Sequence, residues 1–146
     1  MQKFEKTFEV KWADVDQNRH VRHSAYNDYA AYVRIRFITE AGFGANKLEE
    51  LNLGPILFKE ECSFIKEIKP DDTVRVNMLN GDISENASRW KIHHEIFNQR
   101  DEKVAHITVK GAWMDMVKRK LADPPTELAK AFQCLPSGED YIYGKD

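Results

Sequence analysis

The chain contains few cysteines and no long run of apolar residues. Its two cysteines, Cys62 and Cys134, lie far apart in the sequence and form no metal-binding spacing. A membrane-spanning helix needs about 18 consecutive apolar residues, and no such run is present, so we expect no membrane partner. The N-terminal residues alternate between charged and apolar side chains and lack the apolar core of a signal peptide. We therefore expect a protein of the reducing cytoplasm.

A marked excess of charge of either sign is also absent. The chain has 22 Lys and Arg residues against 24 Asp and Glu residues, which gives a formal net charge of −2. This balance does not favour a nucleic-acid partner. Hydrophobic residues make up 42% and charged residues 32% of the 146 positions, which is typical of globular rather than disordered proteins. We expect residues 1–146 to form one domain.

The hydrophobic pattern changes its period along the chain. Apolar and polar residues alternate over 4–12, which predicts a half-buried strand with Trp12 on its apolar face. Apolar residues follow helical spacing over 24–41, where Ser24 is the expected N-cap and Gly42 the expected stop. The other expected elements are a short amphipathic stretch at 46–51, strands at 56–68, 73–78, 90–96 and 105–113, a loop at 81–87, a helix at 124–132, and a loosely held tail from Pro136.

The long helix precedes four of the five predicted strands, and the links between those strands are of hairpin length. This order predicts an α+β fold, in which an antiparallel sheet wraps around one main helix. We expect a bulge near Phe64 and interpret Cys62 as a small buried hydrophobe. His94 falls on the apolar face of its strand and His93 on the other face, so the two histidines are not expected to share a metal ion.

The residues best suited to chemistry lie in the loop before the long helix. Asp14, Asp16, His20 and His23 fall within ten residues of one another. Backbone N–H groups are free at a helix N-terminus and the helix dipole is positive there, so an anion or a developing oxyanion is stabilised. A nearby carboxylate can act as a nucleophile or as a base for water. The pattern favours chemistry on a carbonyl compound, with Asp14 interpreted as a turn or solvent residue.

The stretch from Trp12 to Gly42 resembles the 4-hydroxybenzoyl-CoA thioesterase family, whose members have the hotdog fold. The family pattern is D-x-D, a turn that contains Gly, then V-x-[NH]-x-x-Y, and a helix that ends in Gly. The matching residues here are Asp14-Val15-Asp16, Val21-Arg22-His23, Tyr26 and Gly42. One departure is Arg19, which stands where the family usually has Gly. Because a left-handed backbone suits Asn better than Arg, we expect the turn to shift to Asn18.

The resemblance implies a five-stranded antiparallel sheet wrapped around the helix at 24–41, in a subunit of a homodimer or homotetramer. It implies that acyl-CoA thioesters bind at the dimer interface and are hydrolysed to a free acid and CoA, without a metal or cofactor. It implies that Asp16 is the catalytic carboxylate and that the backbone amide of His23 polarises the thioester carbonyl. His20 is similar to the histidine that many members carry in this loop, which makes it a further catalytic candidate.

Three other residues are candidates for substrate binding. Tyr26 belongs to an aromatic stripe that is mostly core, part of which would line an acyl tunnel in a hotdog fold. Arg89 and Lys91 are our candidates for contacts to the CoA phosphates, which need several positive donors. We interpret Arg34 and Arg36, within the helix, as ion-paired or interface residues.

Several alternatives stay open on the sequence. The scaffold could bind an acyl-CoA or an acyl-carrier ligand without cleaving it, or it could be a hydratase or dehydratase of 3-hydroxyacyl thioesters. Asp16, His20 and His23 also have the composition of a two-histidine, one-carboxylate metal site. The structural alternative for Asp16 is to cap a turn or the helix. The sequence does not specify the acyl group, nor whether Asp16 attacks the carbonyl directly or activates a water.

Overall fold

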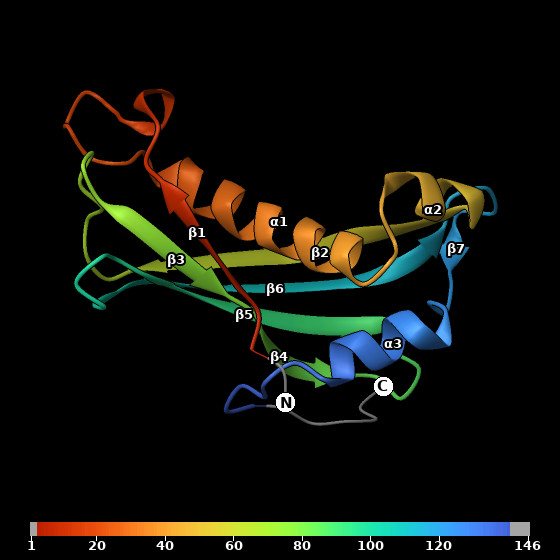
Figure 1. The fold of residues 1–146 in the computed structure, drawn as a ribbon. Coiled ribbons are helices and arrows are strands. Elements are labelled where there is room, and N and C mark those ends of the chain that lie inside the picture. Colours follow the sequence, from red (N-terminus) through yellow and green to blue (C-terminus); the bar gives the residue numbers. More distant parts are fainter. Residues whose placement is uncertain (1–2, 141–146) are drawn as a thin grey trace.

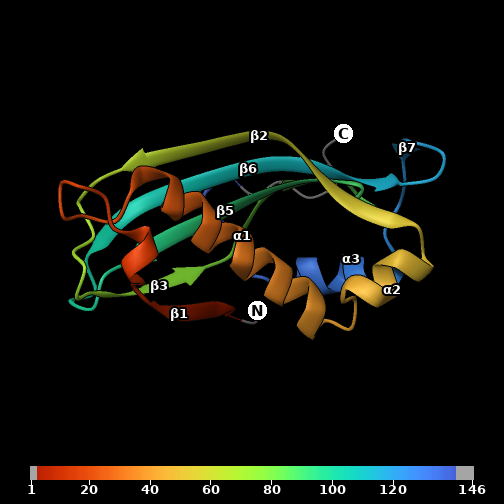
Figure 2. The same ribbon diagram turned by 90° about the horizontal axis from the view of Figure 1, so that it is seen from above.

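A long helix, α1, lies across a curled antiparallel sheet that wraps around it (Figures 1 and 2). The computed structural model describes residues 3–140. The hydrogen-bonded path through the sheet runs β1-β3-β5-β6-β2, with β4 beside β5 and β7 beside β6. The elements are β1 (Glu5–Glu9), the 3₁₀ helix η1 (Trp12–Asp14), α1 (His23–Glu40), α2 (Ala45–Glu50), β2 (Leu53–Phe64), β3 (Thr73–Asn77), β4 (Leu79–Ile83), β5 (Arg89–Phe97), β6 (Lys103–Asp115), β7 (Lys120–Leu121) and α3 (Thr126–Gln133).

Helix α1 buries one face, as its helical spacing of apolar residues predicts. Its buried residues are Ala25, Tyr26, Tyr29, Ala30, Val33, Phe37 and Ile38. The predicted cap is wrong, because the helix begins at His23 after Arg22, and the Ser24 hydroxyl instead accepts a 2.6 Å hydrogen bond from Arg22 Nη1. Gly42 has a φ angle of 97°, which is the left-handed stop that the sequence predicts. The wrapped helix of the α+β prediction is confirmed.

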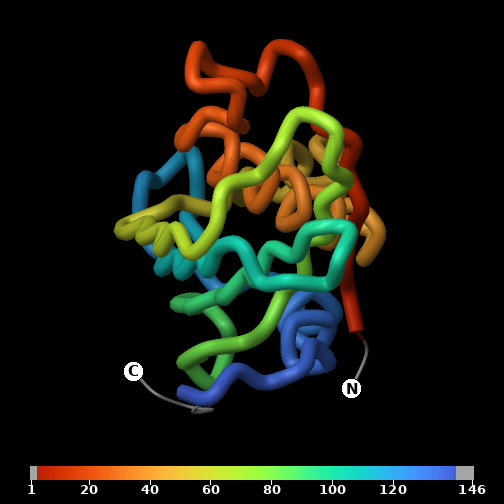
Figure 3. Tube along the Cα trace, turned by 90° about the vertical axis from the view of Figure 1, so that its left-hand side faces the viewer, coloured from red at the N-terminus to blue at the C-terminus, as the bar shows by residue number. Residues whose placement is uncertain are grey.

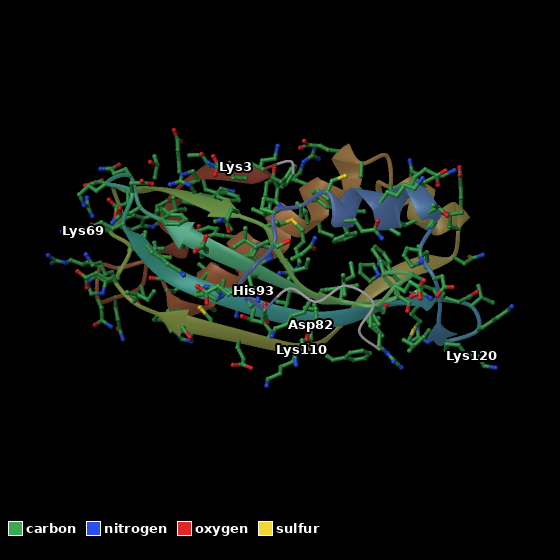
Figure 4. All side chains as sticks on the ribbon, turned by 90° about the horizontal axis from the view of Figure 1, so that it is seen from below. Lys3, Lys69, Asp82, His93, Lys110 and Lys120 are labelled. Atoms are coloured by element: carbon green, nitrogen blue, oxygen red, sulfur yellow. The ribbon has the colours of Figure 1, made fainter. Side chains whose placement is uncertain are left out.

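The central strands β5 and β6 separate the core from an outer polar face. His94 of β5 is buried in the core with Ile92 and Ile96, while the alternate residues of the strand face outward. Figure 4 views the sheet from the side away from α1, and His93 and Lys110 lie on this outer face. The predicted division of the two adjacent histidines between opposite faces is therefore confirmed.

Strand β1 is shorter than its sequence pattern predicts. Its pairing with β3 ends at Glu9 and Thr73, because β3 begins there. The chain then leaves the sheet and enters η1. Trp12, expected on the apolar face of the strand, is instead 91% exposed.

The long strand β2 forms one edge of the sheet and pairs along its length with β6. The bulge predicted near Phe64 is present just after it, where the N–H groups of Ile65 and Lys66 both donate to the Val104 carbonyl. A second, unpredicted register shift lies between Leu57 and Lys59 and makes Phe58 an extra residue. An extra residue bends a strand and increases its twist, which lets this edge follow the curl of the sheet.

Two short strands, β4 and β7, are not evident in the sequence pattern. Strand β4 overlaps the expected loop at 81–87. Its centre, Asn80-Gly81-Asp82, lacks the apolar residues that would predict a buried strand. The Asn80 side chain donates a 2.5 Å hydrogen bond to the Phe132 carbonyl, and the Asn80 backbone N–H donates to the Pro136 carbonyl. Strand β4 pairs with β5, and these long-range contacts bury its polar residues.

The described part of the C-terminal tail is held against the sheet, contrary to the expectation of a loose tail. The Gly138 N–H donates to the Asn80 carbonyl, and Asp140 forms ion pairs with Lys91 and with His93 on the outer face. The rest of the predicted tail lies outside the described residues. The helices within residues 3–140 include none that is both long and apolar enough to cross a membrane.

Candidate active site at the start of helix α1

The loop at residues 10–22 stands at the end of the molecule where α1 begins (Figure 3). A bridge between Val15 and Val21 closes the loop, and the Val21 N–H donates a 2.9 Å hydrogen bond to the Ile68 carbonyl. An open pocket of about 320 Å³ lies beside this loop. Its lining residues are Asp16, His20, Val21, His23, Tyr26, Phe64, Ile65, Lys66 and Glu67.

The Asp16 carboxylate is held by the backbone of its own loop. One carboxylate oxygen accepts hydrogen bonds from the Asn18 N–H at 2.9 Å and from the His20 N–H at 3.3 Å. The other oxygen has no hydrogen-bond partner within the part of the chain that the structure describes. The turn thus orients the carboxylate and leaves one oxygen available at the pocket.

His23, at the start of α1, lines the same pocket. Arg22 is the N-cap residue, its side chain does not cap the helix, and His23 is the first helical residue. The Ala25 N–H bonds to the Arg22 carbonyl, whereas the N–H groups of His23 and Ser24 have no partner among residues 3–140. Unpartnered amides at the positive end of an 18-residue helix can stabilise a negatively charged oxygen.

His20 is paired across the pocket with a residue from a distant part of the chain. Its Nε2 atom lies 2.7 Å from a carboxylate oxygen of Glu67, in the link between β2 and β3. Both side chains remain partly exposed. This contact orients the imidazole towards Glu67.

Asp14 lies in the single turn of η1, as its interpretation as a turn residue predicts, but its side chain does not face solvent and instead joins the loop to the helix. One of its oxygens accepts a 2.8 Å hydrogen bond from the Tyr29 hydroxyl, and the other lies 3.4 Å from Arg22 Nη2. The Asp14 side chain is only 13% exposed. Burial and the adjacent Asp14 carboxylate raise the pKa of Tyr29, so its hydroxyl keeps the donated proton.

Arg19 itself takes the left-handed backbone conformation, with a φ angle of 64°. The expected shift of the turn to Asn18 is therefore wrong. The Arg19 N–H closes the turn by donating a 3.0 Å hydrogen bond to the Asp16 carbonyl. Arginine replaces the family's usual glycine without removing the left-handed turn, at the cost of an unfavourable backbone conformation.

Tyr26 forms an aromatic wall of the pocket together with Phe64 at the end of β2. Their rings meet edge to face with 4.9 Å between centroids, and Tyr26 is 3% exposed while Phe64 is exposed. Burial raises the pKa of Tyr26, so its hydroxyl is neutral over the physiological range. The sequence alone does not reveal Phe64, Ile65, Lys66 and Glu67 as pocket residues, because they lie more than forty positions from the loop and carry no local motif.

The structure brings Asp16, His20, His23 and Tyr26 together but leaves Arg89 and Lys91 elsewhere. Both basic residues alternate with the buried residues of β5 and lie on the outer face of the sheet. Lys91 pairs with Asp140 there. Within one chain, neither residue lines the pocket that contains Asp16, and their contact with CoA phosphates stays a prediction.

The geometry also bears on two alternative sites, a metal site in the Asp16 loop and a nucleophilic thiol at Cys62. Among residues 3–140, no three His, Cys, Asp or Glu side chains are arranged to hold a metal ion, and His20 turns to Glu67 instead. Cys62 is a free thiol packed beside the core, and burial raises its pKa to about 11. A thiol with such a pKa is almost fully protonated at neutral pH, which disfavours a nucleophilic role.

Comparison with known proteins agrees with this geometry. The thioesterase-like superfamily matches residues 10–132, a span that runs from the Asp16 loop into α3. The chain belongs to this superfamily. No curated protein matches the sequence of this thioesterase-like protein.

Solved structures share the fold over most of the chain at low sequence identity. Staphylococcus aureus SAV2348, solved in complex with CoA, has a TM-score of 0.85 at 19% identity, covering 94% of this chain and 88% of that chain. Synechocystis Slr0204, a 1,4-dihydroxy-2-naphthoyl-CoA thioesterase, has a TM-score of 0.81 at 16% identity, covering 92% and 98%. A DHNA-CoA thioesterase of Staphylococcus aureus has a TM-score of 0.80 at 18% identity, covering 91% and 90%. The hotdog fold expected from the sequence is confirmed.

Proposed function

We propose that this thioesterase-like protein hydrolyses acyl-CoA thioesters to a free acid and CoA. One observation carries the proposal: a carboxylate with an available oxygen, Asp16, and the unpartnered amide of the first helical residue, His23, lie at one pocket. Hydrolysis of a thioester needs a nucleophile or base on one side of the carbonyl carbon and a donor for the carbonyl oxygen. The SAV2348 structure in complex with CoA supports CoA as the carrier.

The proposed reaction begins at the available Asp16 oxygen. This oxygen either attacks the carbonyl carbon to give an anhydride, which water then cleaves, or removes a proton from a water that attacks. In both routes negative charge develops on the carbonyl oxygen, and the His23 N–H at the positive end of α1 stabilises it. The C–S bond breaks, and the CoA thiolate takes up a proton. His20, oriented by Glu67, is our candidate for the donor of that proton.

We also propose that the active protein is a dimer formed along β2. This strand is an edge of the sheet, and its outer side has no strand partner among residues 3–140. Exposed apolar residues follow this edge and the neighbouring face of α1: Ile35, Leu57, Phe58, Phe64 and Ile65. Antiparallel pairing of β2 with the same strand of a second copy would extend the sheet and cover these side chains in a self-complementary interface.

The test of the reaction is release of CoA thiol from a panel of short, long and aromatic acyl-CoAs. Thiol release is expected from at least one substrate. Retention of acyl-CoA without thiol release would instead indicate a binding protein. A change in double-bond absorbance without thiol release would indicate a hydratase or dehydratase.

A further inference from the structure

A second cavity lies between α1 and β2, beyond the Asp16 pocket. Its volume is about 180 Å³. Nine of its ten lining residues are apolar, from α1, β2, β5, β6 and α3: Ala31, Ile35, Ile38, Pro55, Leu57, Trp90, Ile92, Trp113 and Phe132. The tenth is Arg34, which places a single positive charge in an otherwise apolar cavity.

The Arg34 guanidinium is buried but incompletely paired. Its side chain is 11% exposed, and Nη1 donates a 3.1 Å hydrogen bond to His94 Nε2. The nearest carboxylate oxygen, on Glu60, is 3.9 Å from Nη2, which is too long for a hydrogen bond. A guanidinium has five N–H donors, so most of those on Arg34 have no partner among residues 3–140. Burial lowers the pKa of Arg34, which reflects the cost of keeping this charge from water.

His94 orients Arg34 without neutralising it. The His94 side chain is fully buried, and desolvation, with Arg34 next in effect, lowers its pKa to about 3. The imidazole is therefore neutral at physiological pH. Its Nδ1 lies 2.7 Å from the Asn77 carbonyl, which can only accept, so Nδ1 carries the proton and Nε2 accepts from Arg34. His94 is a positioning residue that holds the guanidinium beside the cavity with its charge intact.

Among residues 3–140, Arg34 is the one charged residue that lines the cavity. Apart from Glu60, whose side chain is about one-third exposed, no carboxylate is ion-paired with Arg34 in the described residues. A buried guanidinium with unpartnered N–H groups favours a ligand group that is anionic and accepts hydrogen bonds.

We propose that this cavity receives the acyl group of the substrate and that Arg34 binds a carboxylate at the end remote from the thioester. The substrates are then acyl-CoAs whose acyl chain ends in a carboxylate. This inference rests on the proposed thioesterase function. A guanidinium and a carboxylate match in charge and in the geometry of two parallel hydrogen bonds, and the apolar lining accommodates the intervening methylene groups.

The position of the cavity is compatible with the Asp16 pocket. Arg34 lies eleven residues after His23, which corresponds to about 16 Å along the axis of α1. The Asp16 pocket is at the Phe64 end of β2, and the cavity is near the other end, at Pro55 and Leu57. Antiparallel pairing about the middle of β2 would exchange these ends, so the cavity of one protomer would lie towards the Asp16 pocket of its partner.

The test compares CoA thioesters of dicarboxylic acids with monocarboxylic acyl-CoAs of the same chain length, over a series of lengths. We expect wild type to prefer the carboxylate-terminated member of the best pair by at least about 100-fold in kcat/KM, because a site built for a hydrogen-bonding group rejects the analogue that lacks it. Arg34→Met should abolish this preference and Arg34→Lys should retain part of it. Arg36→Met, which removes an exposed arginine of the same helix, is the matched control and should leave the preference unchanged.

Binding of non-hydrolysable thioether analogues, measured by calorimetry, separates this inference from the proposed reaction. Arg34-dependent binding of the carboxylate-terminated analogue without any thiol release would support the inference and overturn hydrolysis. Thiol release with equal or better use of the neutral acyl-CoA would support hydrolysis and overturn the inference, leaving Arg34 as an ion pair of Glu60. If Arg34→Met does not fold, the wild-type preference and the Arg34→Lys variant decide the question.

Discussion

The Tyr29 hydroxyl donates a 2.8 Å hydrogen bond to the Asp14 carboxylate, and this bond joins the loop that carries Asp16 to the helix that begins at His23. Tyr29 is buried in the second turn of α1, and Asp14 lies two residues before Asp16. The positions of the proposed carboxylate and of the proposed oxyanion donor relative to each other depend on this contact.

Tyr29→Phe removes the hydroxyl and leaves the Asp14 carboxylate without its buried donor. We expect the free energy of unfolding to fall by about 1–3 kcal/mol and thioester turnover to fall with it, because the loop loses one contact to the helix and keeps only those from Arg22. Urea denaturation and thiol release measure the two effects. Tyr32→Phe is the control, since Tyr32 is exposed, and its change should stay within about 0.5 kcal/mol. Equal stabilities of the two variants would contradict the role of this bond.

Arg19→Gly should stabilise the protein. Arg19 holds a φ angle of 64°, which costs an L-residue about 1–2 kcal/mol, whereas the extra entropy lost by glycine on folding is about 0.5–1 kcal/mol. A gain of up to about 1.5 kcal/mol is expected from urea denaturation. Asn18→Gly, in the same loop but without a left-handed angle, should lower stability. A less stable Arg19→Gly variant would contradict the proposed backbone strain.

His94 should make folding stability depend on pH. Its pKa is lowered to about 3 in the folded protein by burial and by Arg34, whereas an unfolded chain titrates near 6.5. Below about pH 6.5 the unfolded chain binds a proton at His94 that the folded chain does not bind. The free energy of unfolding is therefore highest above pH 6.5 and decreases as the pH falls from 6.5 towards 3. The slope from this residue approaches about 1.4 kcal/mol per pH unit.

His94→Gln is the variant that tests this dependence. Between pH 7.5 and pH 5 it should lose less unfolding free energy than wild type loses, because glutamine does not titrate. His23→Gln, at an exposed histidine, is the control substitution. Parallel curves for wild type and His94→Gln would show that His94 does not produce the effect.

The proposed dimer should depend on the apolar edge at β2. Phe58 is 63% exposed in one chain, at the bulge of this strand. Phe58→Glu should convert the dimer to a monomer in sedimentation velocity, because it places a charge in the interface. Val117→Glu is the control, because Val117 is also an exposed apolar residue but lies in the turn between β6 and β7. A monomeric wild type would remove the basis for the proposed interface.

The spacing of apolar residues was sufficient to predict those helices and strands that have one clearly apolar face. Helix α1, the strands of the central path, and the opposite orientations of His93 and His94 all follow from local spacing. Strand β4 does not, because its polar residues are buried by contacts to α3 and to residues 136–138. A local pattern contains no information about such partners.

Some residues of the candidate site can likewise be predicted from local sequence, whereas others depend on the fold. The cluster of Asp16, His20 and His23 is visible because the loop and the helix start are adjacent in sequence. The contact between Glu67 and His20 depends on the fold and has no local sequence signal. The hydrogen bond that buries the Asp14 side chain is not predicted either, because its partner, Tyr29, lies fifteen residues further on. Arg34 is recognisable as a charged residue in a helix, but its place in an apolar cavity depends on strands from the whole sheet.

The most direct test of the proposed chemistry is thiol release from the best acyl-CoA substrate by Asp16→Asn, with Asp71→Asn as control. Both changes replace a carboxylate by an amide of the same shape, and Asp71 is exposed in the turn before β3. We predict that Asp16→Asn lowers turnover by at least about 100-fold with CoA binding and stability retained, and that Asp71→Asn is active. Near wild-type turnover by a folded Asp16→Asn variant would contradict a catalytic role for this carboxylate.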